Sequence, residues 1–421
     1  MGYKNPVWND NAPPSINAGR LNDLCYTVEK LDFADGRVVV GQKEGETLGT
    51  NATSEGTNTI ASGASSHAEG GQTTASGTAS HAEGKCAQEE SLATVSGPIS
   101  AGATTYTVGS AIGEFRVGAA ILAQNNGANL TGGAIITAKT ETTITVSKSL
   151  NPTTAIASSG SINLFATGMA VGEASHSEGQ NTTANGDNSH SEGLETVASG
   201  EDSHSEGYRT LASGDESHSE GFQTTSGGTA AHSEGFYTVA NGIHSHSEGD
   251  QTTASGKGAH GEGFRTTAEG DYSHAEGRGT IANGTAQHVF GQYNTPNTTD
   301  VEIVGWGTSS TRKNIRTLDQ SGNMTIAGTL TQSSDAQLKT VEGEIPDVSE
   351  IHAVRFRWND VNGQHDDLEH VGYIAQDVEK VAPFLVKEDS NGYKALDYIA
   401  FLCAKMEMLE RRVKELEEKK G

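Results

Sequence analysis

The sequence has few of the residues that build an ordinary globular core. Aromatic residues make up 5% and hydrophobic residues 33% of its 421 residues, and the formal net charge is −26. A chain with this balance usually stays disordered, because it buries too little apolar surface to offset the entropy of folding. No run approaches the roughly eighteen consecutive apolar residues of a membrane-spanning helix. We therefore expect no membrane insertion.

Cysteine and basic residues are also scarce. The three cysteines, Cys25, Cys86 and Cys403, are odd in number and lie in different segments, which excludes a disulfide framework and favours free thiols. Acidic residues number 54 against 28 Lys and Arg, which argues against nucleic acids and anionic membrane surfaces as partners. Residues 1–30 lack the basic and then apolar pattern of a secretory signal. We expect a protein made in the cytoplasm that leaves the cell by lysis or within a particle.

What the chain does have is glycine, 53 residues in all, and a strict period. Nine histidines recur every fourteen residues from His176 to His288, and His67 and His81 begin the same series upstream. All but the last head the motif H-[SAG]-E-G. A short exact period means that each repeat forms one identical turn of a solenoid. Because disorder requires no register, the period excludes disorder in this region.

One repeat, S-H-S-E-G-x-x-T-x-A-x-G-x-x, divides into two halves of seven residues. Each half predicts a strand of four or five residues that ends at a glycine turn. Side chains alternate between the two faces of a strand, and only small ones recur on one of these faces. We place that set inside a narrow coil: Ser175, Ser177, Thr182 and Ala184. His176 and Glu178 then point outward.

The outward residues form two columns, which we call the His/Glu ladder. Stacked turns lie about 4.8 Å apart, so a column of glutamates repels itself unless the parallel histidines neutralise it. The simplest interpretation is a structural hydrogen-bond ladder, in which pairing with Glu raises the pKa of each His. The same residue types also suit a transition metal or a pH switch, although we expect no metal and no cofactor. The ladder residues are His176, Glu178, His190, Glu192, His204, Glu206, His218, Glu220, His232, Glu234, His246, Glu248, His260, Glu262, His274 and Glu276.

Turns this thin cannot bury enough surface alone, so their outward faces must pack against something, most simply two other copies of the chain. The repeat is similar to the head repeats of trimeric autotransporter adhesins, which form a left-handed parallel β-roll. That resemblance implies a homotrimer. His and Glu stand where that family usually has apolar residues, so the ladder either lines the trimer interface or faces water.

The chain divides into six segments by composition: residues 1–40, 41–84, 85–170, 171–292, 293–332 and 333–421. The first holds a short helix from about Ala18 to Leu31, and Trp8 to Asn22 resemble the N-terminal signature of tail fibres from phages of Gram-positive bacteria. This resemblance implies attachment to a phage baseplate or tail protein. Repeats fill the second and fourth segments, and the fifth is a connector that alternates like a strand pair around Gly322.

The third segment, residues 85–170, loses the period and is dense in β-branched residues. It predicts a small β-domain inserted between turns, and insertions in a solenoid map to one face that is often the binding face. The expected strands are Thr105–Val108, Phe115–Val117, Ala120–Leu122, Ile135–Thr137, Thr142–Val146 and Ser161–Phe165.

The last segment begins with S-S-D-A-Q-L-K and continues with F-R-W-N-D, V-G-Y-I-A-Q-D-V-E, A-P-F-L-V and A-L-D-Y. In combination these motifs resemble the intramolecular chaperone domain of phage endosialidase tailspikes. The resemblance implies a domain that trimerises, assists folding of the fibre before it and then releases itself by autoproteolysis. By motif the nucleophile is Ser334 and the base Lys339, with Asp335 between them and Ser333–Ser334 as the scissile bond. Gln337 replaces the family's usual basic residue.

The S-S-D-A-Q-L-K motif has two explanations, one as a catalytic serine and lysine and one as the start of a helix. A serine hydroxyl needs a base, and a lysine serves as one once desolvation lowers its pKa. Without the resemblance, Ser-Ser-Asp would instead indicate a helix N-cap. The chain ends in a helix with apolar residues at a and d positions over nearly three heptads, which favours self-association over a lone amphipathic helix. These residues are Ile399, Leu402, Met406, Leu409, Val413 and Leu416.

The sequence thus predicts a mainly β protein: a trimeric left-handed solenoid of fourteen-residue repeats, with an inserted β-domain and a C-terminal α+β chaperone domain. The function expected is that of a phage tail fibre in the virion tail, whose inserted domain contacts a host cell-surface receptor, expected to be a glycan. Autoproteolysis in cis is the only catalysis expected. The alternatives are a bacterial surface adhesin, weakened by the missing signal, and a glycan depolymerase, weakened because Glu114 and Glu141 lie in no recognisable motif.

Overall fold

The computed structural model describes residues 38–42, 46–85, 93–96, 98–108, 115, 117–125, 128–129, 134–150, 161–166, 168–331, 333–359 and 368–419. They fall into two compact units, Met1–Gly328 and Thr329–Gly421. The predicted N-terminal helix, the tail-fibre signature, Cys25 and Cys86 lie outside the described residues, whereas Cys403 is a free, exposed thiol. None of the helices described is long and apolar enough to cross a membrane.

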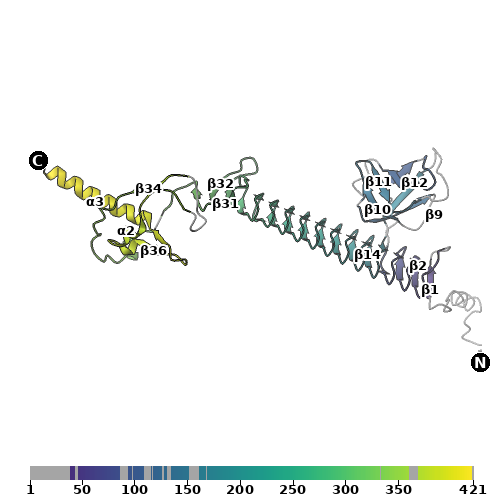
Figure 1. Ribbon diagram of the computed structural model, residues 1–421. Helices are drawn as coiled ribbons and strands as arrows, with labels where there is room; N and C mark the ends of the chain where they lie inside the picture. Colours follow the sequence, from purple (N-terminus) through teal and green to yellow (C-terminus); the bar gives the residue numbers. More distant parts are fainter. Residues whose placement is uncertain are drawn as a thin grey trace, which may run out of the picture. The chain divides into compact units, whose positions relative to one another are not determined.

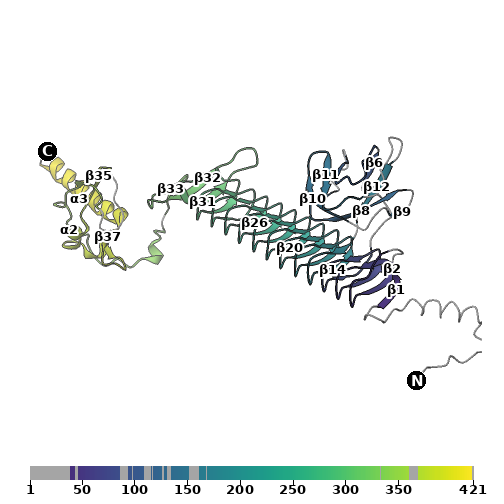
Figure 2. The ribbon, with the colours of Figure 1, turned by 45° about the vertical axis from the view of Figure 1, so that its right-hand side comes forward.

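The repeats form a parallel β-solenoid, as predicted (Figures 1 and 2). Strand β14 (His176–Gln180) pairs with β16 (His190–Leu194) at a shift of fourteen residues, so that each histidine lies opposite the next one. A second strand in each turn, such as β15 (Thr183–Ala184), pairs with its counterpart β17 (Val197–Ala198). This second strand has two residues instead of the expected four or five, because left-handed residues such as Asn181 (φ 59°) precede it.

The same pair of strands recurs along the array. At its start, β1 (Val38–Gln42) pairs with β2 (Thr53–Ala61), which spans both strand positions of its turn. The first strands of the other turns are β3 (His67–Gly71), β5 (His81–Ala82), β14, β16, β18 (His204–Tyr208), β20 (His218–Phe222), β22 (His232–Phe236), β24 (His246–Asp250), β26 (His260–Phe264), β28 (His274–Ala275) and β30 (His288–Gln292). The second strands are β4 (Thr74–Ala75), β13 (Met169–Ala170), β15, β17, β19 (Leu211–Ala212), β21 (Thr225–Ser226), β23 (Val239–Ala240), β25 (Thr253–Ala254), β27 (Thr267–Ala268) and β29 (Ile281–Ala282).

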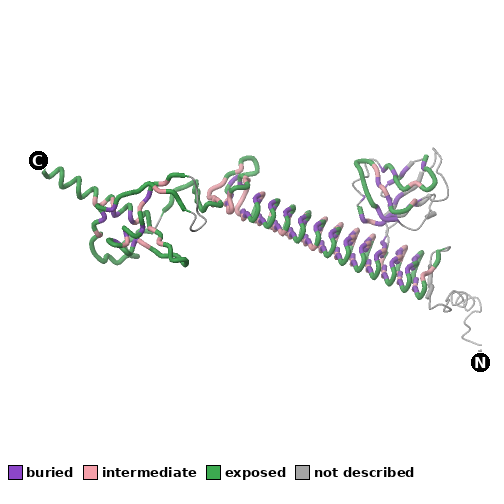
Figure 3. The backbone as a smooth tube through the Cα atoms, viewed as in Figure 1, coloured by how far each residue is buried: buried purple, intermediate pink, exposed green. Residues whose placement is uncertain are grey.

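Each turn buries small side chains, as predicted. Figure 3 marks where buried residues recur along the stack. Ser175, Ser177, Thr182 and Ala184 are each at most 1% exposed. The Ser177 and Thr182 hydroxyls lie 2.8 Å apart and share a hydrogen bond, and the equivalent hydroxyls pair in other turns. Because these buried polar groups satisfy each other, the coil is stable without large apolar side chains.

The glycine after each ladder glutamate is required by the close approach of successive turns. Gly193 has φ +108°, and a Cβ added there would lie 2.3 Å from the carbonyl oxygen of Gly207 in the next turn. That oxygen belongs to backbone that is already hydrogen-bonded into the stack, so it cannot move aside. Gly71, by contrast, has room, because its added Cβ would meet only Lys85 Cγ at 3.7 Å.

We predict that Gly193→Ala destabilises the array by at least about 2 kcal/mol, because the substitution combines a backbone clash with a left-handed conformation. Thermal unfolding of the full chain, followed by circular dichroism, measures the effect. Gly71→Ala is the matched control and should melt within about a degree or two of the parent, as expected for a tolerated surface change. Equal melting temperatures for the two variants would contradict the role assigned to Gly193.

The inserted segment folds as a small antiparallel sheet, which confirms a β-domain there (Figure 2). The strands are β6 (Ala93–Ser96), β7 (Thr105–Thr107), β8 (Ala120–Asn125), β9 (Ala128–Asn129), β10 (Ala134–Lys139), β11 (Thr143–Val146) and β12 (Ser161–Ala166). They lie in the order β6-β12-β8-β10-β11-β7, and β9 pairs with β8. The buried core between them includes Tyr106, Ile121, Ile136, Ile144, Leu150 and Leu164.

One predicted strand of the insert, Phe115–Val117, is wrong. Phe115 lies outside any strand and is 1% exposed in the core of the insert, while Val117 begins a turn with Gly118 at φ +92°. Phe115 therefore packs into the core instead of pairing, and Val117 is exposed. Strands β6 and β9 were not predicted.

The insert interrupts one turn of the solenoid without changing its register. Strand β5 before the insert pairs directly with β14 after it, so that His81 lies opposite His176. Similarly, Met169 at the end of the insert pairs with both Thr74 and Thr183. The insert also contacts the stack, since Ala120 N donates to Thr183 Oγ1 at 3.1 Å.

The stack ends in a short meander. Strand β31 (Asp300–Trp306) still pairs in parallel with β30, whereas β32 (Asn314–Asp319) and β33 (Met324–Ile326) follow in antiparallel. Arg316 lies opposite Ile326, and Gly322 turns the chain at φ +84°. This confirms the strand pair expected around Gly322.

The second unit is a small α+β domain. It contains the 3-10 turns η2 (Ala336–Leu338) and η4 (Pro383–Leu385), the strand pairs β34 (Val354–Phe356) with β35 (His370–Gly372) and β36 (Val386–Glu388) with β37 (Lys394–Leu396), and helices α2 (Ala375–Glu379) and α3 (Tyr398–Glu418). Asp397 caps α3 by accepting from Ala400 N at 3.1 Å. Phe401 and Ala404 attach the helix to a core with Val378, Ala382 and Leu385.

Helix α3 has a second apolar face that its own chain leaves uncovered. The six predicted heptad residues are between 45% and 64% exposed: Ile399, Leu402, Met406, Leu409, Val413 and Leu416. They lie on one helix at heptad spacing. The terminal helix is thus as predicted, and its stripe is free to meet another chain.

Candidate processing site and the His/Glu ladder

The structure brings the two predicted dyad residues together. Lys339 Nζ lies 2.7 Å from Ser334 Oγ and donates a hydrogen bond to it. One turn of 3-10 helix, η2, separates the two residues and folds the lysine back over the serine. A serine hydroxyl in contact with a lysine amine is the arrangement that nucleophilic catalysis requires.

The Asp335 side chain makes a different contact from those of Ser334 and Lys339. It is the N-cap of η2, and its Oδ1 accepts a hydrogen bond from Gln337 N at 2.8 Å. No contact joins its carboxylate to Ser334 or Lys339 in the described part of the chain. The cap that local sequence indicated is therefore formed by Asp335, which shapes the turn and leaves the Ser334 hydroxyl to the lysine.

The dyad and the predicted scissile bond lie on the surface. Ser333, Ser334 and Lys339 are all exposed in the single chain. A lysine accepts a proton only in its neutral form, which removal from water favours. The single chain therefore leaves both side chains open to water.

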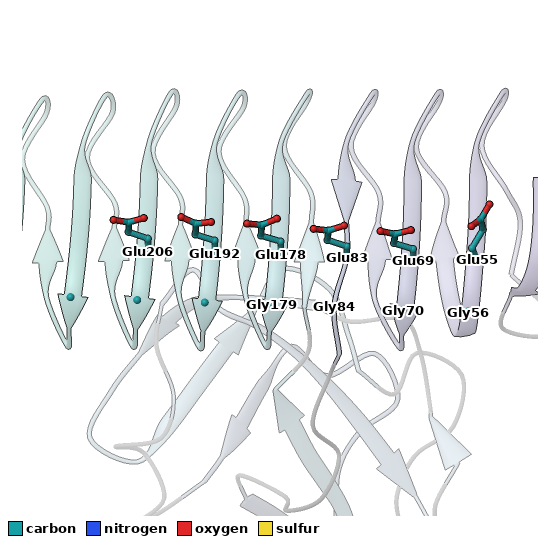
Figure 4. Close-up of a pocket in the computed structure, with 13 residues that line it drawn as sticks. Glu55, Gly56, Glu69, Gly70, Glu83, Gly84, Glu178, Gly179, Glu192 and Glu206 are labelled. Atoms are coloured by element: carbon teal, nitrogen blue, oxygen red, sulfur yellow. The ribbon is translucent and has the colours of Figure 1, made fainter.

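The ladder has a regular geometry. Successive histidine rings stack with centroids 4.7 to 5.0 Å apart and planes within 12° of each other. The glutamates run in a parallel column, as Figure 4 shows from Glu55 to Glu206. Together with the adjacent glycines, several of them line an open groove of about 850 Å³. Ladder side chains in which a histidine lies beside a glutamate are about one-third exposed.

The hydrogen bonds expected between the two columns are not formed by the histidine Nε2 atoms. Nε2 of His176 lies 3.8 Å from Glu178, and the other recorded His–Glu pairs span 3.4 to 3.8 Å. Nε2 of every ladder histidine is buried and has no hydrogen-bond partner within the described residues. The partner also changes along the stack, since His176 is near Glu178 of its own turn but His204 is near Glu192 of the preceding turn.

The expected rise in histidine pKa is wrong. Burial and then the neighbouring histidines lower the pKa of His81, His176, His218, His246 and His274, and these effects outweigh the nearby glutamates. In the other column, hydrogen bonds with Glu69 and Glu178, followed by burial, raise the pKa of Glu83 to about 7. These five histidines therefore take up a proton less readily than a free imidazole, and Glu83 keeps its proton to a higher pH than a free carboxyl group.

These two shifts act on stability in opposite directions. A histidine with a lowered folded pKa stabilises the fold above its unfolded value of about 6.5, and this contribution is lost as the pH falls through the folded pKa. For Glu83 the contribution is present below the ordinary pKa of a glutamate, 4.5, and is lost as the pH rises through the folded pKa of about 7.

We predict that Glu83→Gln raises the melting temperature at pH 8 and that this gain shrinks towards zero below pH 4.5, the ordinary pKa of a glutamate. Glutamine keeps the shape and the hydrogen bonds of a protonated glutamate, so it removes only the cost of ionising the carboxyl group. Thermal melts of the full chain between pH 4 and 8 measure the difference. Glu269→Gln, at an exposed glutamate outside the column, should show no such trend, and a gain independent of pH would contradict the assignment.

A third column, which the sequence analysis missed, follows the ladder glycine. The Tyr208 and Phe222 rings lie 5.0 Å apart and the Phe222 and Phe236 rings 4.8 Å apart, with Tyr237 edge-on to Phe236. Phe236 and Tyr237 are both exposed. Aligning the repeats would have revealed this column, because its residues share one place in the period. The acid proposed for the depolymerase alternative, Glu141, lies exposed in a turn, and Glu114 lies outside the described residues.

Comparison with known families agrees with this geometry. Residues 334–387 match the family model of the chaperone of endosialidase, and the match begins at Ser334. Residues 48–66, 166–189 and 233–259 match the YadA head domain repeat. No curated protein matches the chain. The chain therefore carries an endosialidase-type chaperone domain behind YadA-type head repeats. Such a chaperone domain is typical of phage tail fibres, which are typically trimeric, and it implies intramolecular autoproteolysis.

Proposed function

We propose that this protein is a homotrimeric tail fibre of a phage or phage-like particle, which attaches the particle to the host cell surface. The observation that carries the proposal is the Ser334–Lys339 contact at 2.7 Å, placed at the first residue of the chaperone match. The solenoid forms the shaft, and its location is the virion tail, joined to a baseplate or tail protein through the N-terminal segment.

Uncovered apolar surface supports the trimer. The heptad stripe of α3 is about half exposed, and the aromatic column of Tyr208, Phe222 and Phe236 adds apolar surface on the solenoid. Burying a stripe of this kind contributes about 25 cal/mol for each Å² removed from water. Two further copies of the same chain supply matching stripes in both units.

The cleavage we propose proceeds in cis. Lys339 takes the proton of the Ser334 hydroxyl, whose oxygen attacks the carbonyl carbon of Ser333. The Ser333–Ser334 peptide bond breaks, its nitrogen takes up a proton, and Ser333 is left as an ester on Ser334 Oγ. Water then hydrolyses the ester to a Ser333 carboxylate and a free Ser334 hydroxyl. Cover from neighbouring copies in the trimer would supply the desolvation that an exposed lysine needs to act as a base.

We predict that Ser334→Ala and Lys339→Ala each leave the full-length chain intact, with cleavage reduced by at least about a hundredfold, as expected for loss of a nucleophile or its base. Denaturing gels and intact-mass measurement after expression detect the products. Ser333→Ala is the control and should still be cut, because it keeps the hydroxyl at residue 334. A C-terminal fragment beginning at residue 334 in the Ser334→Ala variant would refute the dyad.

We assign host contact to the insert. It projects from one turn between β5 and β13, while the stack continues beneath it in unbroken register. A folded module added to a shaft in this way alters neither the length nor the pairing of the shaft. The receptor expected is a cell-surface glycan.

This arrangement permits a clean excision. Lys85 and Met169 occupy the places that Gln180 and Thr183 occupy one turn later, where only Asn181 and Thr182 lie between them. We predict that replacing residues 86–168 by Asn-Thr leaves the trimer and its melting temperature unchanged but abolishes binding to host cells and to a glycan array. Sedimentation first verifies that the excised protein is still a trimer, and calorimetry measures its melting temperature. Full binding by the excised trimer would refute the role of the insert.

The YadA head match favours one other function, that of a bacterial surface adhesin. Mass spectrometry distinguishes the two. Peptides of the chain, ending at Ser333, in purified particles support the tail fibre, whereas peptides only in the bacterial surface fraction support the adhesin.

A further inference from the structure

The ladder leaves a set of nitrogen atoms unexplained. Nε2 of His67, of His81 and of the nine histidines spaced fourteen residues apart from His176 to His288 is buried and lacks a hydrogen-bond partner in the described part of the chain. A buried polar atom without a partner normally costs free energy. The same unpaired atom recurs turn after turn, and in nine of these histidines a carboxylate oxygen lies 3.4 to 3.8 Å from it. A repeated donor pair of this kind indicates a ligand.

The distances between the donors fit a metal ion. Zinc bonds to imidazole nitrogen and carboxylate oxygen measure about 2.0–2.2 Å, so two such donors on one tetrahedral ion lie about 3.4 Å apart and a wider angle brings them to about 3.8 Å. The recorded Nε2–carboxylate distances run from 3.4 Å at His288–Glu276 to 3.8 Å at His176–Glu178. They are too long or too poorly aligned for a hydrogen bond, yet they span the range expected for two ligands of one ion.

In several places along the stack a third donor lies close to a His–Glu pair. His176, Glu178 and His190 place their ligand atoms within 4.8 Å of one another, and so do Glu192, His204 and Glu206. The group His260, Glu262 and His274 repeats the first arrangement further along the stack. Small side-chain rotations would bring three such donors onto one ion. Imidazole with carboxylate is a donor set that suits zinc and its neighbours in the first transition row.

We propose that the His/Glu ladder binds divalent transition-metal ions of the zinc type, each held by histidine and glutamate side chains of two adjacent turns. Every ion joins one turn to the next and neutralises part of the carboxylate column. Neighbouring groups share residues, since Glu69 belongs to one with His67 and to one with His81. Dications in adjacent turns would also repel each other, so the expected loading is about one ion for every two turns.

Zinc titration of the metal-stripped full chain tests the proposal. Calorimetry should detect several ions per chain, and the melting temperature should rise with zinc and return to its starting value with EDTA. Co²⁺ should give a visible absorption spectrum typical of nitrogen and oxygen ligands in four-fold coordination. Failure of zinc to bind, or binding without any shift in melting temperature, would overturn the inference.

Variants locate the ions. His218→Gln with His246→Gln removes two nitrogen donors, and Glu220→Gln with Glu234→Gln removes two carboxylates of similar shape. Each double variant should lose about one to two ions per chain, as expected if neighbouring groups share residues. His244→Asn is the matched control, because His244 is exposed outside the ladder at φ 57°, a conformation that asparagine tolerates.

The control should bind as many ions as the parent. Circular dichroism verifies that each variant folds, and the carboxylate pair provides a second measurement if the histidine pair does not fold. Unchanged stoichiometry in the folded ladder variants, or an equal loss in His244→Asn, would overturn the proposal.

Discussion

The structure depends on one interaction, the parallel backbone pairing of each turn with the turn fourteen residues later. Pairing at this register places every residue directly above its counterpart, so that a single choice of residue becomes a column. In a column, a contact between residues of two adjacent turns is repeated along the whole stack. It stacks imidazoles at ring distance, brings carboxylates close enough to share a proton near Glu83, and excludes any side chain at Gly193. The hydroxyl pairs inside the coil follow from the same repetition, since Ser177 and Thr182 satisfy each other within one turn and need nothing from the next.

Much of this follows from the sequence because a period constrains all copies at once. The alternation of small and charged residues was enough to place Ser177 inside and His176 outside, and the heptads at Leu402 and Leu409 were enough to give a helix with an uncovered stripe. The dyad was found by motif, and its geometry agrees because only one turn of 3-10 helix separates Ser334 from Lys339. The spacing of two residues only five positions apart is largely fixed by local backbone conformation, so a short motif can predict that their side chains meet.

The predictions that were wrong share a physical cause. They depended on distances between side chains, which a sequence does not contain. Opposite charges at neighbouring positions suggested ion pairs, but burial followed by the neighbouring His190 lowers the pKa of His176, and hydrogen bonds with Glu69 and Glu178 raise the pKa of Glu83. The apolar pattern of Phe115 to Val117 suggested a strand, but a positive φ at Gly118 turns the chain and sends Phe115 into the core.

The period that makes the shaft easy to build also makes it easy to misalign. His190 can lie beside His176 of its own chain, and in a trimer a neighbouring chain could shift by one whole turn and meet nearly the same side chains, because the repeats are almost identical. A sheet whose register is weakly specified tends to slip. A segment without the repeat can supply the alignment that we propose for a trimer, and the domain beginning at Ser334 is such a segment, with its own core and a helix that has an exposed apolar stripe. Once the turns are hydrogen-bonded along the whole array, slipping requires all of them to break together, so the aligning domain is no longer needed. A cut at its first residue is then the point at which removal leaves the shaft complete.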